Sequence, residues 1–208
     1  MTDEPKKAFT LEGFLRQVFK GVLEGIGGWL NSMGVRPNMV TIAGLVGNVM
    51  AAVLIAFGKL TWGGLIAMLM GPLDAVDGTM ARLRNESSAY GGFVDSVMDR
   101  YDELIILAGL LIHFQQQGDW LGGLLVYFAA MGSVLVSYVR ARAETLGFNA
   151  KVGILTRVER YLILIPGIIF NKPLISLGII AVLANFTALQ RFFYVRKQAK
   201  LEPSNHLN

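Results

Sequence analysis

The sequence predicts an all-α, polytopic membrane protein with six transmembrane helices and an N-terminal amphipathic helix in the membrane interface. Hydrophobic residues make up 53% of the 208 and charged residues only 16%, and the mean hydropathy is +0.50. This composition is too apolar for a soluble domain of such length. The apolar residues also form runs that can cross a bilayer, separated by short polar turns. No cysteine is present, which excludes disulfide and thiolate chemistry.

Residues 9–33 have the pattern of an amphipathic helix. Apolar side chains recur at helical spacing along one face from Leu11 to Met33, and the other face carries Glu12, Arg16, Lys20 and Glu24. A helix of a soluble core would show the same pattern, but the apolar chain that follows favours a helix in the membrane interface. We therefore expect residues 1–38 to form a cytoplasmic, interfacial region, and we identify no signal peptide in it.

Six apolar segments define a predicted transmembrane catalytic domain over residues 39–197, followed by a cytoplasmic tail over 198–208. The pair Gly71-Pro72 should kink the second segment. The fifth apolar run ends at Phe170 and has only ten residues, so its helix must begin earlier and hold Arg157 and Arg160 at some depth. The expected spans are Met39–Gly58, Thr61 into the acidic motif, Ala89–Phe114, Trp120–Tyr138, the segment ending at Phe170, and Leu174–Gln190.

The distribution of basic residues predicts the orientation. Six spans place both termini on one side of the membrane, and only Lys59 and Lys172 of the 19 basic residues fall in turns on the other side. The positive-inside rule makes the side of the termini cytoplasmic. We therefore expect a multi-pass protein of the cell membrane with its active site on the cytoplasmic side. The net charge of +4 is modest, and no nucleic-acid partner is expected.

The stretch from Asp74 to Asp99 carries the candidate chemistry and reads DAVDGTMARLRNESSAYGGFVDSVMD. Asp74 and Asp77 are i,i+3 neighbours, and Asp95 and Asp99 are i,i+4 neighbours, so each pair shares one helix face. Two such faces, if opposed, form a cage of hard oxygen ligands that suits Mg²⁺, Mn²⁺ or Ca²⁺ better than zinc. A single aspartate here would be a solvated helix-end charge, but four at this spacing favour a metal site.

Three further residues of the motif suit a phosphate-bearing ligand. Gly78 and Ala81 keep the helix thin, so that a ligand can approach its backbone, and Arg82 can bind a phosphate through two parallel hydrogen bonds. Three charged residues that follow the motif either extend the polar site or pair among themselves as structural ions, and we favour the structural role; they are Arg100, Asp102 and Glu103.

The pattern D-x2-D-G-x2-A-R-x8-G-x3-D-x3-D, which begins at Asp74, resembles the signature of the CDP-alcohol phosphotransferase family at every fixed position. Members of this family are membrane enzymes with six transmembrane helices. They transfer a phosphoryl-linked group from a CDP-activated lipid or alcohol to an acceptor hydroxyl and release CMP. The six predicted spans extend the resemblance over nearly the whole chain.

The resemblance implies a role for each motif residue. Asp74, Asp77 and Asp95 would hold one or two Mg²⁺ or Mn²⁺ ions at the pyrophosphate, and Asp99 would be a further metal ligand or the catalytic base. Gly78, Ala81 and Arg82 would lie against the CDP group. Physical chemistry agrees, because only metal cations can bring a pyrophosphate beside four carboxylates. The family also suggests a homodimer.

A second stretch, Ser137 to Glu144 with Arg157 to Arg160, resembles the bacterial phosphatidylinositol-phosphate synthases, a branch of the family that uses inositol 1-phosphate. The residues that would bind the acceptor phosphate are Ser137, Arg140, Arg157, Arg160 and Arg196. This chain has Arg140 and Val158 where that branch is expected to have Lys and Pro. Such basic residues could instead anchor helix ends to anionic headgroups.

These observations predict transfer of a phosphatidyl group from CDP-diacylglycerol to inositol 1-phosphate in phospholipid biosynthesis. Glycerol 3-phosphate is an alternative acceptor, because it too is a phosphomonoester, and the product would then be phosphatidylglycerol phosphate. A divalent-cation transporter is a remote alternative from another class, since carboxylates inside a membrane often mark ion paths. Few polar groups continue across the bilayer, which argues against transport.

Overall fold

The computed structural model describes residues 11–201, and within them every regular element is an α-helix. The predicted ends, residues 1–10 and 202–208, lie outside the described part of the chain. The helices are α1 (Leu11–Val18), α2 (Lys20–Ser32), α3 (Pro37–Ala56), α4 (Leu60–Met70), α5 (Leu73–Leu83), α6 (Ala89–Gln116), α7 (Trp120–Thr145), α8 (Arg157–Ile169) and α9 (Pro173–Leu201).

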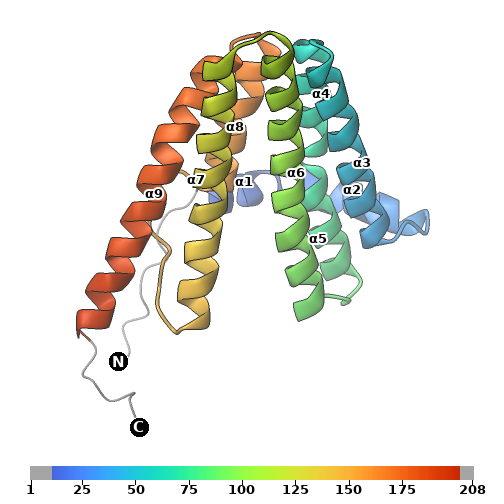
Figure 1. The fold of residues 1–208 in the computed structure, drawn as a ribbon. Coiled ribbons are helices and arrows are strands. Elements are labelled where there is room, and N and C mark those ends of the chain that lie inside the picture. Colours follow the sequence, from blue (N-terminus) through green and yellow to red (C-terminus); the bar gives the residue numbers. More distant parts are fainter. Residues whose placement is uncertain (1–10, 202–208) are drawn as a thin grey trace.

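The helices from α3 to α9 form a bundle that is narrow at one end and wide at the other (Figure 1). The short turns at 57–59, 117–119 and 170–172 gather at the narrow end. Helix α7 packs most extensively against α9, and α3 packs against both α6 and α4. Helices α7 and α9 diverge from α3 and α6 toward the wide end, where α5 and the first turns of α6 lie. The acidic motif therefore lies in the open part of the bundle.

One continuous apolar core joins α3, α4, α6, α7, α8 and α9. Small residues let the helices approach closely within it. A Cβ atom on Gly109 would lie 2.5 Å from the carbonyl oxygen of Ala52, and one on Gly132 would lie 2.8 Å from the Cβ of Ala184. The fully buried members of the core include Ala51, Ile55, Ala67, Leu110, Ala129, Ile168, Leu177 and Ala184.

The outer faces of the bundle are apolar as well. Three helices of the described chain are long and apolar enough to cross a membrane, namely α3, α7 and α9. Large hydrophobic side chains stand exposed on all three, which is the arrangement of a protein whose surrounding solvent is lipid. Examples are Ile42, Val46 and Val53 on α3, Leu121, Leu124 and Phe128 on α7, and Ile175, Val182 and Phe186 on α9. The protein is therefore an all-helical membrane protein.

The predicted second span is broken in two, as the pair Gly71-Pro72 suggested. Helix α4 ends at Met70 and α5 begins at Leu73. Proline lacks the N–H that would continue the helical ladder. The ring of Tyr161 lies where a Cβ on Gly71 would be, and its hydroxyl donates a hydrogen bond to the carbonyl of Ala67. The break thus holds α8 against α4 and turns α5 toward the wide end.

The N-terminal segment forms two helices where the sequence predicted one. Helices α1 and α2 meet at Phe19, and backbone bonds from Phe19 to Leu15 and from Leu23 to Phe19 continue across the junction. Helix α2 packs against α5. In Figure 1 both short helices lie across the wide part of the bundle instead of extending its long helices.

Candidate functional site

The four motif aspartates are carried by two helices that flank the open end of the bundle. Asp74 and Asp77 lie in the first two turns of α5, and Asp95 and Asp99 lie in the first three turns of α6. Helix α6 begins where the Ser88 hydroxyl accepts a hydrogen bond from the N–H of Gly91, a regular N-cap.

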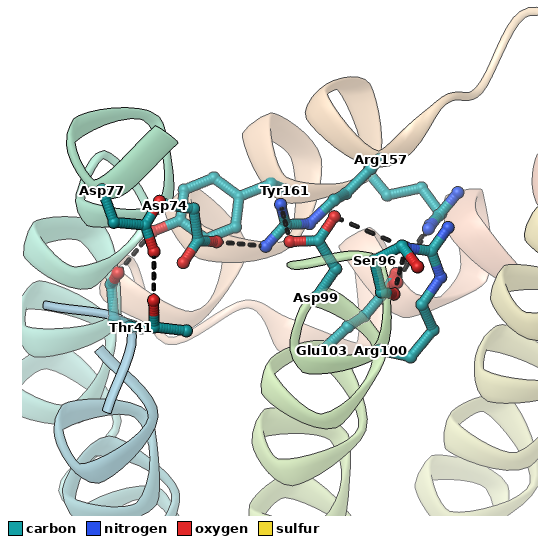
Figure 2. A network of polar contacts seen from close by, with 11 residues as sticks. Thr41, Asp74, Asp77, Ser96, Asp99, Arg100, Glu103, Arg157 and Tyr161 are labelled. Atoms are coloured by element: carbon teal, nitrogen blue, oxygen red, sulfur yellow. Dashed lines mark hydrogen bonds and ion pairs between the residues drawn. The ribbon is translucent and has the colours of Figure 1, made fainter. Parts of the chain in front are cut away.

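Arg157 joins these two helices. Its guanidinium donates from Nη2 to Oδ2 of Asp74 at 2.5 Å, and its Nη1 forms a close ion pair with Oδ1 of Asp99. Both carboxylates are largely buried, with 14% of each side chain exposed, whereas 37% of the Arg157 side chain is exposed. Figure 2 shows Asp74 and Asp99 pointing toward the same guanidinium from opposite sides. The two predicted helix faces are therefore opposed.

The other two aspartates belong to the same cluster. Asp77 is 6% exposed and accepts a hydrogen bond of 2.5 Å from the hydroxyl of Thr41 on α3 (Figure 2). Asp95 is more exposed and lies close enough to interact electrostatically with both Asp77 and Asp99. Four carboxylates thus converge on a small region between α3, α5, α6 and α8.

The donor chemistry of this cluster fits a hard divalent cation. Carboxylate oxygens are the ligands that Mg²⁺ and Mn²⁺ prefer, and two helices direct them at a single cationic group. Within residues 11–201, no three carboxylate or imidazole groups stand together as a complete cage. The assignment of all four aspartates as metal ligands stays a prediction.

Arg160, one helical turn after Arg157, is held by a different carboxylate. Its Nε and Nη2 donate to the two oxygens of Glu103 at 2.6 and 2.7 Å, and Nη1 donates to the carbonyl of Leu155 at 3.4 Å. Arg160 is only 2% exposed. Glu103 is therefore a structural ion, but its partner is Arg160 and not Arg100 or Asp102, with which the sequence suggested it would pair. Arg100 instead contacts Asp99 at 3.4 Å and the carbonyl of Ser96 at 2.5 Å.

The local fold explains how both arginines reach this point. Thr156 and Glu159 form a capping box at the start of α8, and the N–H of Thr156 donates to Oε2 of Glu159 at 2.9 Å. The preceding N–H, that of Leu155, donates to the hydroxyl of Thr187 on α9 at 3.3 Å. As the sequence predicted, the fifth apolar helix begins before its apolar run, at Arg157.

One cavity adjoins the cluster, and a second lies beside α5. The first, of about 40 Å³, has room for a water molecule or two. Its polar lining consists of Asn48, Asp74, Asp102, Glu103, Arg157, Arg160 and Tyr161. A larger groove of about 540 Å³ runs between α2 and α5 and is lined by Lys20, Leu23, Glu24, Ala75, Thr79, Arg82 and Leu83.

The predicted nucleotide residues lie on α5 beside this groove. Arg82 is exposed and donates to the hydroxyl of Thr79 at 2.8 Å, and a Cβ on Gly78 would lie 3.6 Å from the Arg82 guanidinium. Ala81 is half-buried. The groove therefore offers two cations, Arg82 from α5 and Lys20 from α2, and the small side chains of Ala75 and Thr79 on the α5 wall.

The remaining acceptor candidates are more dispersed. Arg140 pairs with Glu144 on the same face of α7 at 3.1 Å, and both side chains are over two-fifths exposed. Ser137 is half-buried on α7, and Arg196 is exposed on α9. The structure brings Arg157 and Arg160 together and leaves Arg140 held by a neighbouring carboxylate.

Arg191 is a buried cation that the sequence analysis did not select. It is 3% exposed and donates from Nε to the carbonyl of Val152 at 2.8 Å and from Nη1 to that of Val136 at 2.6 Å. It lies close enough to Arg140 and Arg160 to interact with their charges. The sequence feature that could have identified Arg191 is its position directly after an apolar span. In the structure α9 continues for ten more residues, up to Leu201.

The chain is similar to known phospholipid synthases over most of its length. The chain is 33% identical over 192 residues to the archaetidylinositol phosphate synthase of Pyrococcus horikoshii, covering 90% of this chain and 97% of the relative. It is also 33% identical over 192 residues to the phosphatidylinositol phosphate synthase of Mycobacteroides abscessus, covering 87% of this chain and 86% of the relative.

The fold is similar to solved structures of the phosphatidylinositol phosphate synthase of Mycobacterium tuberculosis. The structure with bound CDP-DAG has a TM-score of 0.76 at 28% identity and covers 84% of this chain and 93% of the other. The structure with manganese and citrate has a TM-score of 0.78 at 27% identity and covers 84% and 88%. Residues 34–193 match the CDP-alcohol phosphatidyltransferase family, so the chain belongs to that family of enzymes.

Proposed function

We propose that the protein transfers a phosphatidyl group from CDP-diacylglycerol to inositol 1-phosphate and releases CMP. One observation carries this proposal: Asp74 and Asp99, from two helices, meet at Arg157, and a second arginine follows one helical turn later on α8. Carboxylates for a metal and cations for a phosphate therefore adjoin each other. The names of the relatives support the acceptor, since they include a phosphatidylinositol phosphate synthase from a bacterium and an archaetidylinositol phosphate synthase from an archaeon.

The reaction assigns a task to each part of the site. The acceptor hydroxyl oxygen forms a bond to the phosphatidyl phosphorus, the bond from this phosphorus to the CMP oxygen breaks, and the hydroxyl proton passes to Asp99. Arg82 binds the nucleotide phosphate, and Arg157 binds the phosphate of the acceptor. Asp74, Asp77, Asp95 and Asp99 would hold a divalent ion, which would neutralise charge on the pyrophosphate. Manganese in a related structure supports this metal requirement.

The acceptor pocket would contain the remaining cations of this region. Arg191 on α9 lies within electrostatic range of Arg140 on α7 and of Arg160, and Ser137 and Arg196 complete the candidate set. Arg160 has its guanidinium engaged by Glu103, so we assign it to the wall of the pocket, where it adds positive potential. Arg157 is the more exposed of the two arginines and is the proposed direct contact.

The membrane arrangement is part of the proposal. Six crossings by α3, α4 with α5, α6, α7, α8 and α9 would form a domain over residues 39–197, with α1 and α2 in the interface. The site and both termini would face the cytoplasm, where the water-soluble acceptor is found and CMP is released. The exposed apolar helices leave room for a homodimer, which the family resemblance suggested.

An acceptor assay with purified protein tests the function. CDP-diacylglycerol, Mg²⁺ or Mn²⁺, and either inositol 1-phosphate or glycerol 3-phosphate are supplied, and CMP release is measured. We expect release with inositol 1-phosphate, and release with glycerol 3-phosphate alone would overturn the choice of acceptor. Asp99→Asn should lower the rate by roughly 10²- to 10⁴-fold, the range for loss of a general base.

A matched control uses the other end of the bundle. Asp119 caps α7 by accepting a hydrogen bond of 2.9 Å from the N–H of Gly122. Asparagine caps helices as well as aspartate does, so Asp119→Asn should keep the activity of the unchanged protein. Equal losses in both variants would show that the effect of Asp99→Asn does not come from the site.

A further inference from the structure

Arg157 lies against carboxylate oxygens that a metal ion would also contact. Its guanidinium contacts Oδ2 of Asp74 and Oδ1 of Asp99, two of the predicted ligands, on different helices. A carboxylate oxygen that accepts a charge-assisted hydrogen bond has less electron density to offer a cation, and two positive charges repel at such short range. Arg157 and a divalent ion therefore compete for the same oxygens.

The two arginines of α8 differ in how firmly they are held. Arg160 is 2% exposed, and Glu103 and the carbonyl of Leu155 together engage its guanidinium. Arg157 is 37% exposed and sits at the first residue of the helix. An arginine with a partly exposed stem can change rotamer at small cost, whereas one fixed by a bidentate, buried pair cannot. Of these two arginines, only Arg157 contacts the aspartates, and it is the more exposed; Arg100 on α6 also contacts Asp99, at 3.4 Å, but it does not bridge the two helices.

We infer that Arg157 is a displaceable internal counter-ion, which leaves Asp74 and Asp99 when a divalent metal binds and then becomes available to the phosphate of the acceptor. This inference rests on the proposed function, because it uses the same acceptor and metal. It adds a coupling between metal and acceptor. The metal displaces Arg157, which the acceptor phosphate then binds, and the acceptor draws Arg157 away from the carboxylates that the metal needs. By linkage, each ligand tightens binding of the other by the same factor.

Metal binding without the lipid substrate tests this coupling directly. Free Mn²⁺ is measured by its electron paramagnetic resonance signal during titration of the purified protein in detergent. Arg157→Gln should tighten Mn²⁺ binding by roughly 5- to 100-fold, the usual range of coupling between two sites. Arg157→Lys, which keeps the charge but cannot span both carboxylates, should lie between that variant and the unchanged protein. Unchanged or weaker Mn²⁺ binding in Arg157→Gln would overturn the inference.

The control for charge alone is Arg142→Gln. Arg142 is an exposed cation near the end of α7. Its removal should change Mn²⁺ affinity by less than about twofold, since exposed charges are screened within about 10 Å in salt. An equal gain in both variants would show a general effect of net charge and would also overturn the inference.

The second arm adds inositol 1-phosphate to the titration, with the Mn²⁺ bound by inositol 1-phosphate alone subtracted. The acceptor should tighten Mn²⁺ binding in the unchanged protein and leave it unaltered in Arg157→Gln. Equal tightening in both would show that the acceptor acts without Arg157. These outcomes are independent of turnover: a protein that releases no CMP from CDP-diacylglycerol refutes the proposed function, whereas an active protein without the coupling refutes only this inference.

Discussion

At the scale of single residues, Thr41 determines how Asp77 is oriented. Its hydroxyl donates to Asp77 at 2.5 Å, and the alternative acceptor, the carbonyl of Pro37, is 3.3 Å away. Thr41→Val keeps the shape of the side chain and removes this donor from a carboxylate that is 6% exposed. Loss of a hydrogen bond to a metal ligand typically weakens metal affinity by 10- to 100-fold. We expect a shift of about that size in the Mn²⁺ dependence of CMP release.

Thr41→Ser is the matched control, because serine retains the hydroxyl on the same helix face. It should keep the Mn²⁺ dependence within about threefold of the unchanged protein, since hydrogen-bond acceptance by Asp77 is restored. A valine variant with unaltered Mn²⁺ dependence would exclude Asp77 as a metal ligand that relies on Thr41.

Spacing in the sequence was sufficient to find the aspartates, because residues three or four apart on a helix must share a face. It could not find their partners. Arg157 is 83 positions from Asp74, and Arg160 is 57 positions from Glu103. Which arginine meets which carboxylate depends on how α8 is rotated against α5 and α6, and no local pattern encodes that rotation. Arg191 was missed for a similar reason, since its partners are backbone carbonyls.

At the scale of helices, the Arg160–Glu103 ion pair fastens α8 to α6. The pair is bidentate, with 3% of the Arg160 side chain and 16% of the Glu103 side chain exposed. Removing one partner leaves the other charge buried, which costs about 3–5 kcal/mol. We therefore expect Glu103→Ala and Arg160→Ala each to unfold at much lower temperature in detergent, and the double variant to lose less than the sum of the two.

The exposed pair Arg140–Glu144 supplies the comparison. Both side chains are over two-fifths exposed, so Glu144→Ala should cost no more than about 1 kcal/mol. If Arg160 served the acceptor alone, its loss would raise the KM for inositol 1-phosphate and leave the unfolding temperature near that of the unchanged protein.

The contact between α3 and α6 depends on Gly109. A Cβ there would lie 2.5 Å from the carbonyl oxygen and 2.8 Å from the Cα of Ala52, which are backbone atoms that cannot rotate away. Gly109→Ala should therefore destabilise the protein by about 1–3 kcal/mol, as overpacking of a core does. At Gly123 the added Cβ meets only a leucine methyl group at 3.7 Å. Gly123→Ala should leave thermal stability unchanged or raise it slightly, because alanine favours helix.

The apolar pattern predicted where the helices lie, but it did not predict where α7 and α9 end. The break at Gly71-Pro72 and the start of α6 at Ala89 agree with prediction, because proline and caps act locally. Helices α7 and α9 continue to Thr145 and Leu201, well beyond the ends of their apolar runs. Hydropathy marks the point where a chain leaves the lipid, whereas the backbone hydrogen bonds of a helix continue through the polar residues that follow. The predicted tail accordingly begins inside α9.

At the scale of the whole molecule, the bundle is closed at one end and open at the other (Figure 1). Core packing joins α7 with α9 and α3 with α6 near the closed end, and the charged residues of α5, α6 and α8 fill the divergence. A lipid-linked nucleotide can therefore keep its acyl chains beside the apolar helices while its pyrophosphate reaches the aspartates. This arrangement is useful only if the open end faces the compartment that holds nucleotide and acceptor.

The absence of cysteine from the sequence allows that orientation to be measured without background. Ser87 lies exposed in the turn between α5 and α6, and Lys172 lies exposed in the turn between α8 and α9, at the opposite end of the bundle. We expect a membrane-impermeant maleimide to label Lys172→Cys in intact cells and to label Ser87→Cys only after the membrane is permeabilised. The reason is the positive-inside rule, which keeps the arginine-rich end in the cytoplasm.

Both variants should be labelled equally in detergent, which controls for reactivity of the new thiols. Labelling of Ser87→Cys in intact cells, with protection of Lys172→Cys, would place the aspartates on the outer surface, away from cytoplasmic nucleotides. Labelling of both in intact cells would mean that the turn after α5 and the turn after α8 share one side, so that the six-span arrangement fails. Because α4 and α8 are each shorter than a bilayer crossing needs, this second outcome tests the part of the topology that composition alone supports least.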